Sequence, residues 1–122
     1  MKSFDVRLIE KKNRRFVEAL GRIDHLECEK DVVDLLSVCS QFKAERILLH
    51  GNIFTEKFFD LKSGQAGMVV QKLVNYQIKT AALLTPDQVR GKFGEFVVET
   101  NHGHHFRVFF DRQSAETWLV AD

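Results

Sequence analysis

The stretch ILLHGNIFTEKFFDLKSGQAGMVVQKLVNYQIKTAALL, from Ile47 to Leu84, decides the fold class. It begins with a short, fully apolar run at 47–49 and ends with a second strand-like segment at 78–84. Between them, apolar residues recur at the spacing of one helix face; they are Ala66, Val69, Val70, Leu73 and Val74. A strand–helix–strand unit forms a parallel pair with a right-handed crossover, and continuous apolar runs suit strands covered on both faces. We therefore expect 47–49 and 81–84 to be inner parallel strands.

The flanking sequence extends this unit on both sides. Alternating apolar residues predict a strand near 4–8, and a second strand at 16–20 follows the basic run 11–15, which we interpret as a hairpin turn. Helical spacing is found over 31–42 and 89–100, and a last strand is expected at 106–110. The order predicts one α/β domain spanning 1–122, with a mixed, mostly parallel five-stranded sheet whose first strand is an antiparallel edge.

Several residues are expected to end or cap these helices. Thr55 and Ser63 precede helical segments and have hydroxyls that accept backbone hydrogen bonds, and Ser114 is in the same position before a short final helix. Gly103 follows the helix at 89–100, where a left-handed glycine commonly ends a helix.

Composition limits the class of partner. The chain has 122 residues and a net charge of +1, which argues against a dedicated nucleic-acid or membrane-surface protein. The sequence opens with no signal peptide and has no long apolar run, so we expect a cytoplasmic protein with Cys28 and Cys39 reduced.

A candidate site is expected where the strands end, because ligands of open parallel sheets bind outside the carboxyl ends. The segment between His50 and Gly67 is the longest that emerges there. Gly64 and Gly67, at a helix start capped by Ser63, would let a ligand or another chain approach the backbone closely. The alternative is close packing of this helix on its own sheet or on a neighbouring subunit. His50 either faces the same cleft or is a hydrogen-bonded structural histidine.

The reactive side chains of this segment do not complete a catalytic site. Asp60, Lys62 and Ser63 provide an acid, a base and a hydroxyl, but capping by Ser63, capping or pairing by Asp60 and solvation of Lys62 explain them more simply. His102, His104 and His105 have a spacing that zinc sites use, yet no second cluster supplies a fourth ligand. We expect no metal, no cofactor and no catalytic residues.

The sequence resembles a bacterial family described as domain of unknown function 4180. The resemblance rests on FFDLKSGQAG, then QK and NY, then ETNHG; the matching residues are Phe58, Phe59, Asp60, Leu61, Lys62, Ser63, Gly64, Ala66, Gly67, Gln71, Lys72, Asn75, Tyr76, Glu99, Asn101 and Gly103. Its order of strands and helices is similar to that of anti-sigma factor antagonists and sulfate-transporter regulatory domains. Those domains have a serine or threonine beside a glycine at a helix start, which a partner kinase phosphorylates. The resemblance implies a similar fold and a similar place for Ser63.

Two hypotheses for function follow. The first is a non-enzymatic regulatory module that binds a protein partner through the segment 60–67, with Ser63 as a possible phosphorylation site. The alternative is a module that holds a small anionic ligand on the amides of Gly64, Gln65 and Ala66. A homodimer is also expected, because Phe109, Phe110 and Trp118 are large apolar groups near the chain end and 11 phenylalanines are many for one core.

Overall fold

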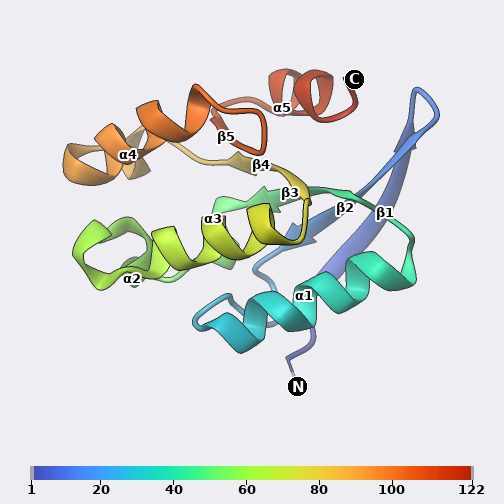
Figure 1. Cartoon of the computed structure of the whole chain (residues 1–122), viewed down its shortest axis with the longest axis horizontal. Helices are drawn as coiled ribbons and strands as arrows, with labels where there is room; N and C mark the ends of the chain where they lie inside the picture. The colour runs from blue at the N-terminus through green and yellow to red at the C-terminus, as the bar shows by residue number, and fades with distance from the viewer. Residues whose placement is uncertain (1, 122) are drawn as a thin grey trace.

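The computed structural model describes residues 2–121, which form five strands, five α-helices and three short 3₁₀ turns (Figure 1). The strands are β1 (Asp5–Lys11), β2 (Arg14–Leu20), β3 (Arg46–His50), β4 (Lys79–Leu83) and β5 (Phe106–Phe109). The α-helices are α1 (Glu29–Gln41), α2 (Glu56–Phe59), α3 (Gln65–Asn75), α4 (Gly91–Asn101) and α5 (Arg112–Leu119). The 3₁₀ turns are η1 (Gly51–Ile53), η2 (Leu61–Ser63) and η3 (Pro86–Gln88).

The sheet has the strand order β1-β2-β3-β4-β5. β1 and β2 are antiparallel, and every other neighbouring pair is parallel. The predicted α/β class, with a mostly parallel sheet and an antiparallel first strand, is therefore confirmed. The hairpin turn lies within the basic run 11–15, of which Lys11, Arg14 and Arg15 already belong to the paired strands. Lys12 and Asn13 are in the left-handed region at φ 52° and 62°, as the two central residues of a tight β-hairpin require.

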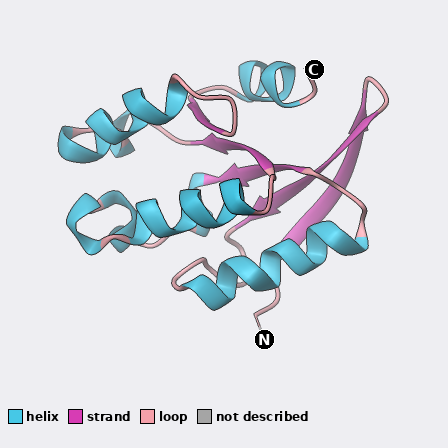
Figure 2. Ribbon diagram, in the orientation of Figure 1, coloured by secondary structure: helices cyan, strands magenta, loops and turns pink. Residues whose placement is uncertain are grey.

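The helices cover the two faces of the sheet unequally. α1, α3 and α4 lie side by side on one face, while α5 lies on the other (Figures 1 and 2). Within β3, Ile47 and Leu49 belong to the larger core, and Leu48 packs in a second core with Ala115 and Leu119 of α5. The apolar run 47–49 is continuous because successive side chains enter two different cores.

Phenylalanine rings join the segment after β3 to α4. Phe54 stacks on Phe58 with ring centroids 3.7 Å apart, and Phe58 and Phe59 both make edge contacts with Phe93. Phe96 extends the cluster from α4. Much of the phenylalanine content therefore serves packing within one chain, and it fixes α2 and the turn that follows it.

The side chain of Asn101 closes the outer edge of β5. Its Oδ1 accepts a hydrogen bond from the Val108 amide at 2.8 Å, and its Nδ2 donates to the Val108 carbonyl at 3.3 Å. This pair of bonds occupies backbone groups that an edge strand otherwise exposes to pairing with another strand.

Three predicted helix ends are different in the structure. Gly103 is not left-handed; among the described glycines only Gly64 and Gly91 have positive φ. The final helix is capped by Asp111, whose carboxylate accepts from the Ser114 amide at 2.9 Å, so the helix begins one turn earlier than expected. The Thr55 hydroxyl donates to Gln65 Oε1 at 3.3 Å and makes no capping bond to α2. Of the three, only Ser114 is replaced by another capping side chain, that of Asp111.

No helix within residues 2–121 is both long and apolar enough to span a membrane.

Candidate functional site

Gly64 is the corner between η2 and α3. Its φ is 78°, in the left-handed region, and an added Cβ would meet no other atom within 4 Å. Only glycine adopts this conformation without steric cost. Gly64 is thus the residue that flanks the helix rather than part of its first turn, and its role within the chain is to turn the backbone into α3.

Ser63 caps α3 from one residue further back. Its Oγ accepts a hydrogen bond from the amide of Gln65, the first helical residue, at 3.1 Å, and donates to the Lys57 carbonyl at 2.5 Å. Asp60 acts similarly one turn earlier, since its Oδ1 accepts from the Lys62 amide at 3.2 Å. These side chains hold an exposed turn in a single shape, and both lie on the surface.

Gly67 lies in the first turn of α3 and points outward. An added Cβ would meet no atom within 4 Å, whereas the neighbouring Ala66 is completely buried in the core. Close packing of this glycine on the chain's own sheet, the alternative raised by the sequence, is therefore wrong. A glycine within a helix costs about 1 kcal/mol relative to alanine, and no close contact with the described residues 2–121 requires a glycine here.

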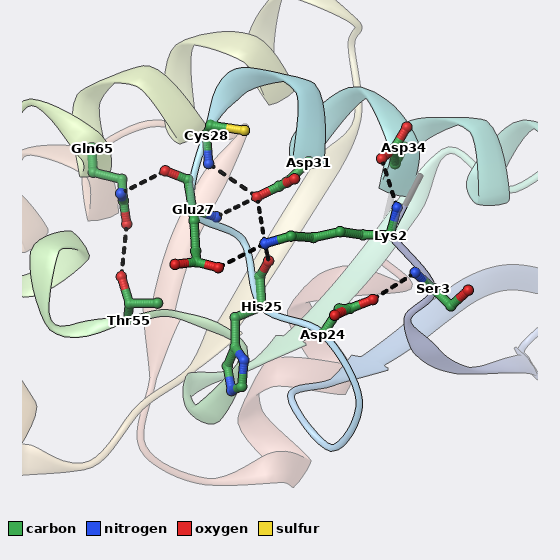
Figure 3. A network of polar contacts seen from close by, with 10 residues as sticks. All are labelled: Lys2, Ser3, Asp24, His25, Glu27, Cys28, Asp31, Asp34, Thr55 and Gln65. Atoms are coloured by element: carbon green, nitrogen blue, oxygen red, sulfur yellow. Dashed lines mark hydrogen bonds and ion pairs between the residues drawn. The ribbon is translucent and has the colours of Figure 1, made fainter.

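Gln65 anchors the start of α3 (Figure 3). Its side chain is buried, with Nε2 donating to the Glu27 carbonyl at 2.8 Å and Oε1 accepting from Thr55. These contacts tie α3 to the loop before α1 and to the loop before α2. The turn 60–64 therefore lies between two anchored helices: phenylalanine packing holds α2, and the Gln65 side chain holds the start of α3.

An ion-pair network fixes the loop that carries Glu27 (Figure 3). Lys2 Nζ lies 2.8 Å from the Glu27 carboxylate and 2.9 Å from that of Asp31, which also accepts from the amides of Glu27 and Cys28. Burial alone would raise the pKa of Asp31, but the bonds from Lys2 and from the backbone outweigh it and lower that pKa. Asp31 is therefore ionised when it closes the start of α1.

His50 does not face the segment 60–67. Its Nε2 lies 2.6 Å from Glu18 Oε2, on the face of the sheet that α5 covers, whereas α3 packs on the opposite face. Glu18 is also held by Arg112 of α5, and this hydrogen bond is the main cause that lowers the pKa of Glu18. The structure thus supports the interpretation of His50 as a hydrogen-bonded structural histidine, and the shared cleft is not formed.

The network around Glu18 continues to the hairpin. Arg112 pairs with Glu116 at 2.7 Å, and Lys11 pairs with the same carboxylate at 2.7 Å. These residues were not predicted from the sequence, although Glu18 is conspicuous as a lone acid in the otherwise apolar run FVEAL at 16–20. Each acid in this network is paired with a base. Its role is therefore structural: it links α5 to the β1–β2 hairpin.

The histidines near 102–105 diverge. His104 lies beside Arg107, while His105 lines a shallow groove together with Val70 and Val74 of α3. Within residues 2–121, no group of three or more histidine, cysteine, aspartate or glutamate side chains is arranged to hold a metal ion.

Comparison with known families agrees with the resemblance seen in the sequence. A family model described as "Domain of unknown function (DUF4180)" matches residues 11–119, which include the whole sheet except the first strand. No match to a curated protein was found. The chain therefore belongs to the DUF4180 family of domains of unknown function.

Proposed function

We propose that this chain is a non-enzymatic regulatory module of the cytoplasm that binds a partner protein through the segment 60–67. The observation that carries the proposal is Gly67, a solvent-facing helical glycine with open space around its missing side chain. Close approach of a partner's backbone to the first turn of α3 would explain why residue 67 is a glycine, because any side chain there would stand in the way. The turn beside it is exposed yet held by internal hydrogen bonds, and a preformed surface loses little conformational entropy on binding.

A protein partner is favoured over a small anionic ligand at the same place. The Gly64 amide donates to the Leu61 carbonyl at 3.1 Å, and the Gln65 amide donates to Ser63 Oγ at 3.1 Å. Two of the three amides that would hold the anion are therefore already occupied within the chain. An anion would have to displace both internal bonds, which weakens the case for this alternative.

Ser63 is the residue that we propose as the switch. A phosphate on Oγ would remove the hydrogen bond to the Lys57 carbonyl and place nearly two negative charges beside the positive end of the α3 dipole. The helix start tolerates this charge, but the turn loses one of the hydrogen bonds that hold its shape, the bond from Ser63 to the Lys57 carbonyl. The placement of Ser63 beside a glycine at a helix start is similar to that in anti-sigma factor antagonists, and we propose that the fold is related to theirs. This likeness is one of fold and position.

The test is capture of partners from a bacterial lysate by matched variants. Gly67→Arg fills open space on the proposed surface, and Gly103→Arg is the control, since an added Cβ there makes only an ordinary contact at 3.5 Å. Ser63→Asp adds charge to the surface, and Ser114→Asp adds the same charge to the first turn of α5. We expect one discrete set of proteins that wild type and both controls retain and that Gly67→Arg and Ser63→Asp lose. Equal capture by all five proteins would refute the proposal.

We also propose that the chain forms a homodimer. Of the three aromatic residues that suggested this from the sequence, Phe110 is the one that now supports it. Phe109 packs against Trp118 within the chain, with ring centroids 5.6 Å apart. Phe110 keeps 57% of its surface exposed, so it is the remaining apolar group of this region that a second copy would cover.

A further inference from the structure

A basic pocket lies near the amino-terminal ends of β3, β4 and β5, away from the segment 60–67. It has a volume of about 420 Å³ and is lined by Arg46, Lys79, His104, Arg107, Trp118 and Ala121. Arg46 and Lys79 are the first residues of β3 and β4 and are direct neighbours in the sheet, and Arg107 lies in β5. The strand register therefore brings three cations from three adjacent strands to one face.

Two of these cations also have a structural role at the end of α5. Arg46 Nε donates to the Leu119 carbonyl at 2.8 Å, and Lys79 Nζ donates to the Trp118 carbonyl at 2.6 Å. Cations at a helix carboxyl end satisfy its last carbonyls and interact well with its dipole. This role explains Arg46 without a ligand. Lys79 Nζ also donates to the Ala121 carbonyl at 3.1 Å, so these two carbonyls use two of the three N–H donors of its ammonium group and leave one for a ligand.

Arg107 is not explained in this way. Its Nε donates to the Gly103 carbonyl at 2.8 Å, and its guanidinium lies 5.3 Å from the centre of the Trp118 ring, beside Lys79 at 4.5 Å from the same ring. Burial lowers the pKa of Lys79 first, and the charges of Arg46, Arg14 and Arg107 lower it further. No aspartate or glutamate is among the described residues that line the pocket. Positive charges gathered in this way favour the binding of an anion between them.

We propose that the basic pocket binds a small anionic ligand, whose phosphate or carboxylate group pairs with Arg107 and Lys79 and whose remaining part packs on Trp118. The guanidinium fork of arginine matches the oxygens of both anionic groups, and an indole ring offers a flat apolar surface beside them. The volume falls within the range of small-molecule sites. The pocket lies on the α5 face, so this inference is independent of the proposed protein-binding surface on α3.

The single tryptophan of the chain makes the test direct, because its fluorescence reports on the pocket itself. Pyrophosphate, AMP and citrate are titrated at constant ionic strength against a sodium chloride blank. We expect a saturable change with at least one of them, and the comparison of pyrophosphate with citrate distinguishes phosphate from carboxylate recognition. No saturable change with any of the three would overturn the proposal.

Matched variants separate a site from general charge attraction. Arg107→Gln should weaken binding about tenfold or more, as loss of a charge-assisted hydrogen bond predicts, and Arg107→Lys should weaken it less. Lys92→Gln removes the same charge at the start of α4, where the lysine side chain is 81% exposed, and should leave binding unchanged. Asp122 lies outside the described residues, and Asp122→Asn controls for competition by its carboxylate; unchanged or tighter binding is expected. Equal weakening by Arg107→Gln and Lys92→Gln would overturn the proposal. If Arg107→Gln does not unfold cooperatively and so is not properly folded, Arg107→Lys is compared with Lys92→Gln instead. Equal binding by these two variants would then overturn the proposal.

Discussion

Replacing Gly67 by alanine should stabilise the protein. The glycine is helical, has no positive φ, and an added Cβ would meet nothing within 4 Å, so the methyl group neither clashes nor buries apolar surface. The remaining effect is the higher helix propensity of alanine and its smaller loss of backbone entropy, together about 0.5–1 kcal/mol. For a domain of this size the unfolding midpoint should rise by about 2–5 °C.

The assay is reversible thermal or urea unfolding, followed by far-ultraviolet circular dichroism. Gly21→Ala is the matched control, because an added Cβ there would lie only 2.0 Å from the Asn52 carbonyl oxygen and must force the backbone apart. This variant should be strongly destabilised by the same measurement. Loss of stability in Gly67→Ala would show instead that the chain's own packing requires a glycine at this position.

Three further outcomes are expected. Gly64→Ala should destabilise the chain by about 1 kcal/mol in urea unfolding, because alanine is strained at φ 78°; an unchanged midpoint would contradict the left-handed turn. The pKa of Glu18 is lowered from 4.5 by Arg112 and His50, so its contribution to stability is present above about pH 4.5 and is lost as the pH falls through the folded-state pKa. The stability of Glu18→Gln should therefore be lower near neutral pH and should fall less in acid, and an acid profile parallel to that of wild type would contradict the network. Phe110→Ser should shift a dimer toward monomer in light scattering, while a wild-type monomer at high micromolar concentration would exclude the homodimer.

The sheet could be predicted because its signals are local and repeated. The apolar run at 47–49, the alternation near 4–8 and the basic hairpin each depend on neighbours a few residues away. The prediction for Ser114 failed because a second polar residue near the helix start, Asp111, accepts the capping hydrogen bond, and the prediction for Thr55 failed because its hydroxyl donates to Gln65, ten residues away. The dihedral angles of the folded backbone decide which group succeeds, as with Asp111 in place of Ser114.

The surroundings of the candidate site depended on long-range contacts instead. Which face His50 takes follows from strand register, and its partner Glu18 is 32 residues away in sequence. The basic pocket likewise exists only because Arg46 and Lys79 are paired across β3 and β4. The sequence identified Ser63 and Gly67 as unusual, but only the structure gave the decisive observation that Gly67 faces open space.

Site-specific photo-crosslinking from the outer face of α3 tests directly whether a partner protein binds there. A photo-reactive amino acid at Gln71 lies one turn beyond Gly67 on an exposed position and leaves the glycine itself free, and the same group at Gln113, exposed on α5, is the control. We expect a discrete crosslinked protein partner from position 71 that is absent from position 113 and is lost when Ser63→Asp is added. The same crosslinks from both positions, or none from position 71, would contradict it.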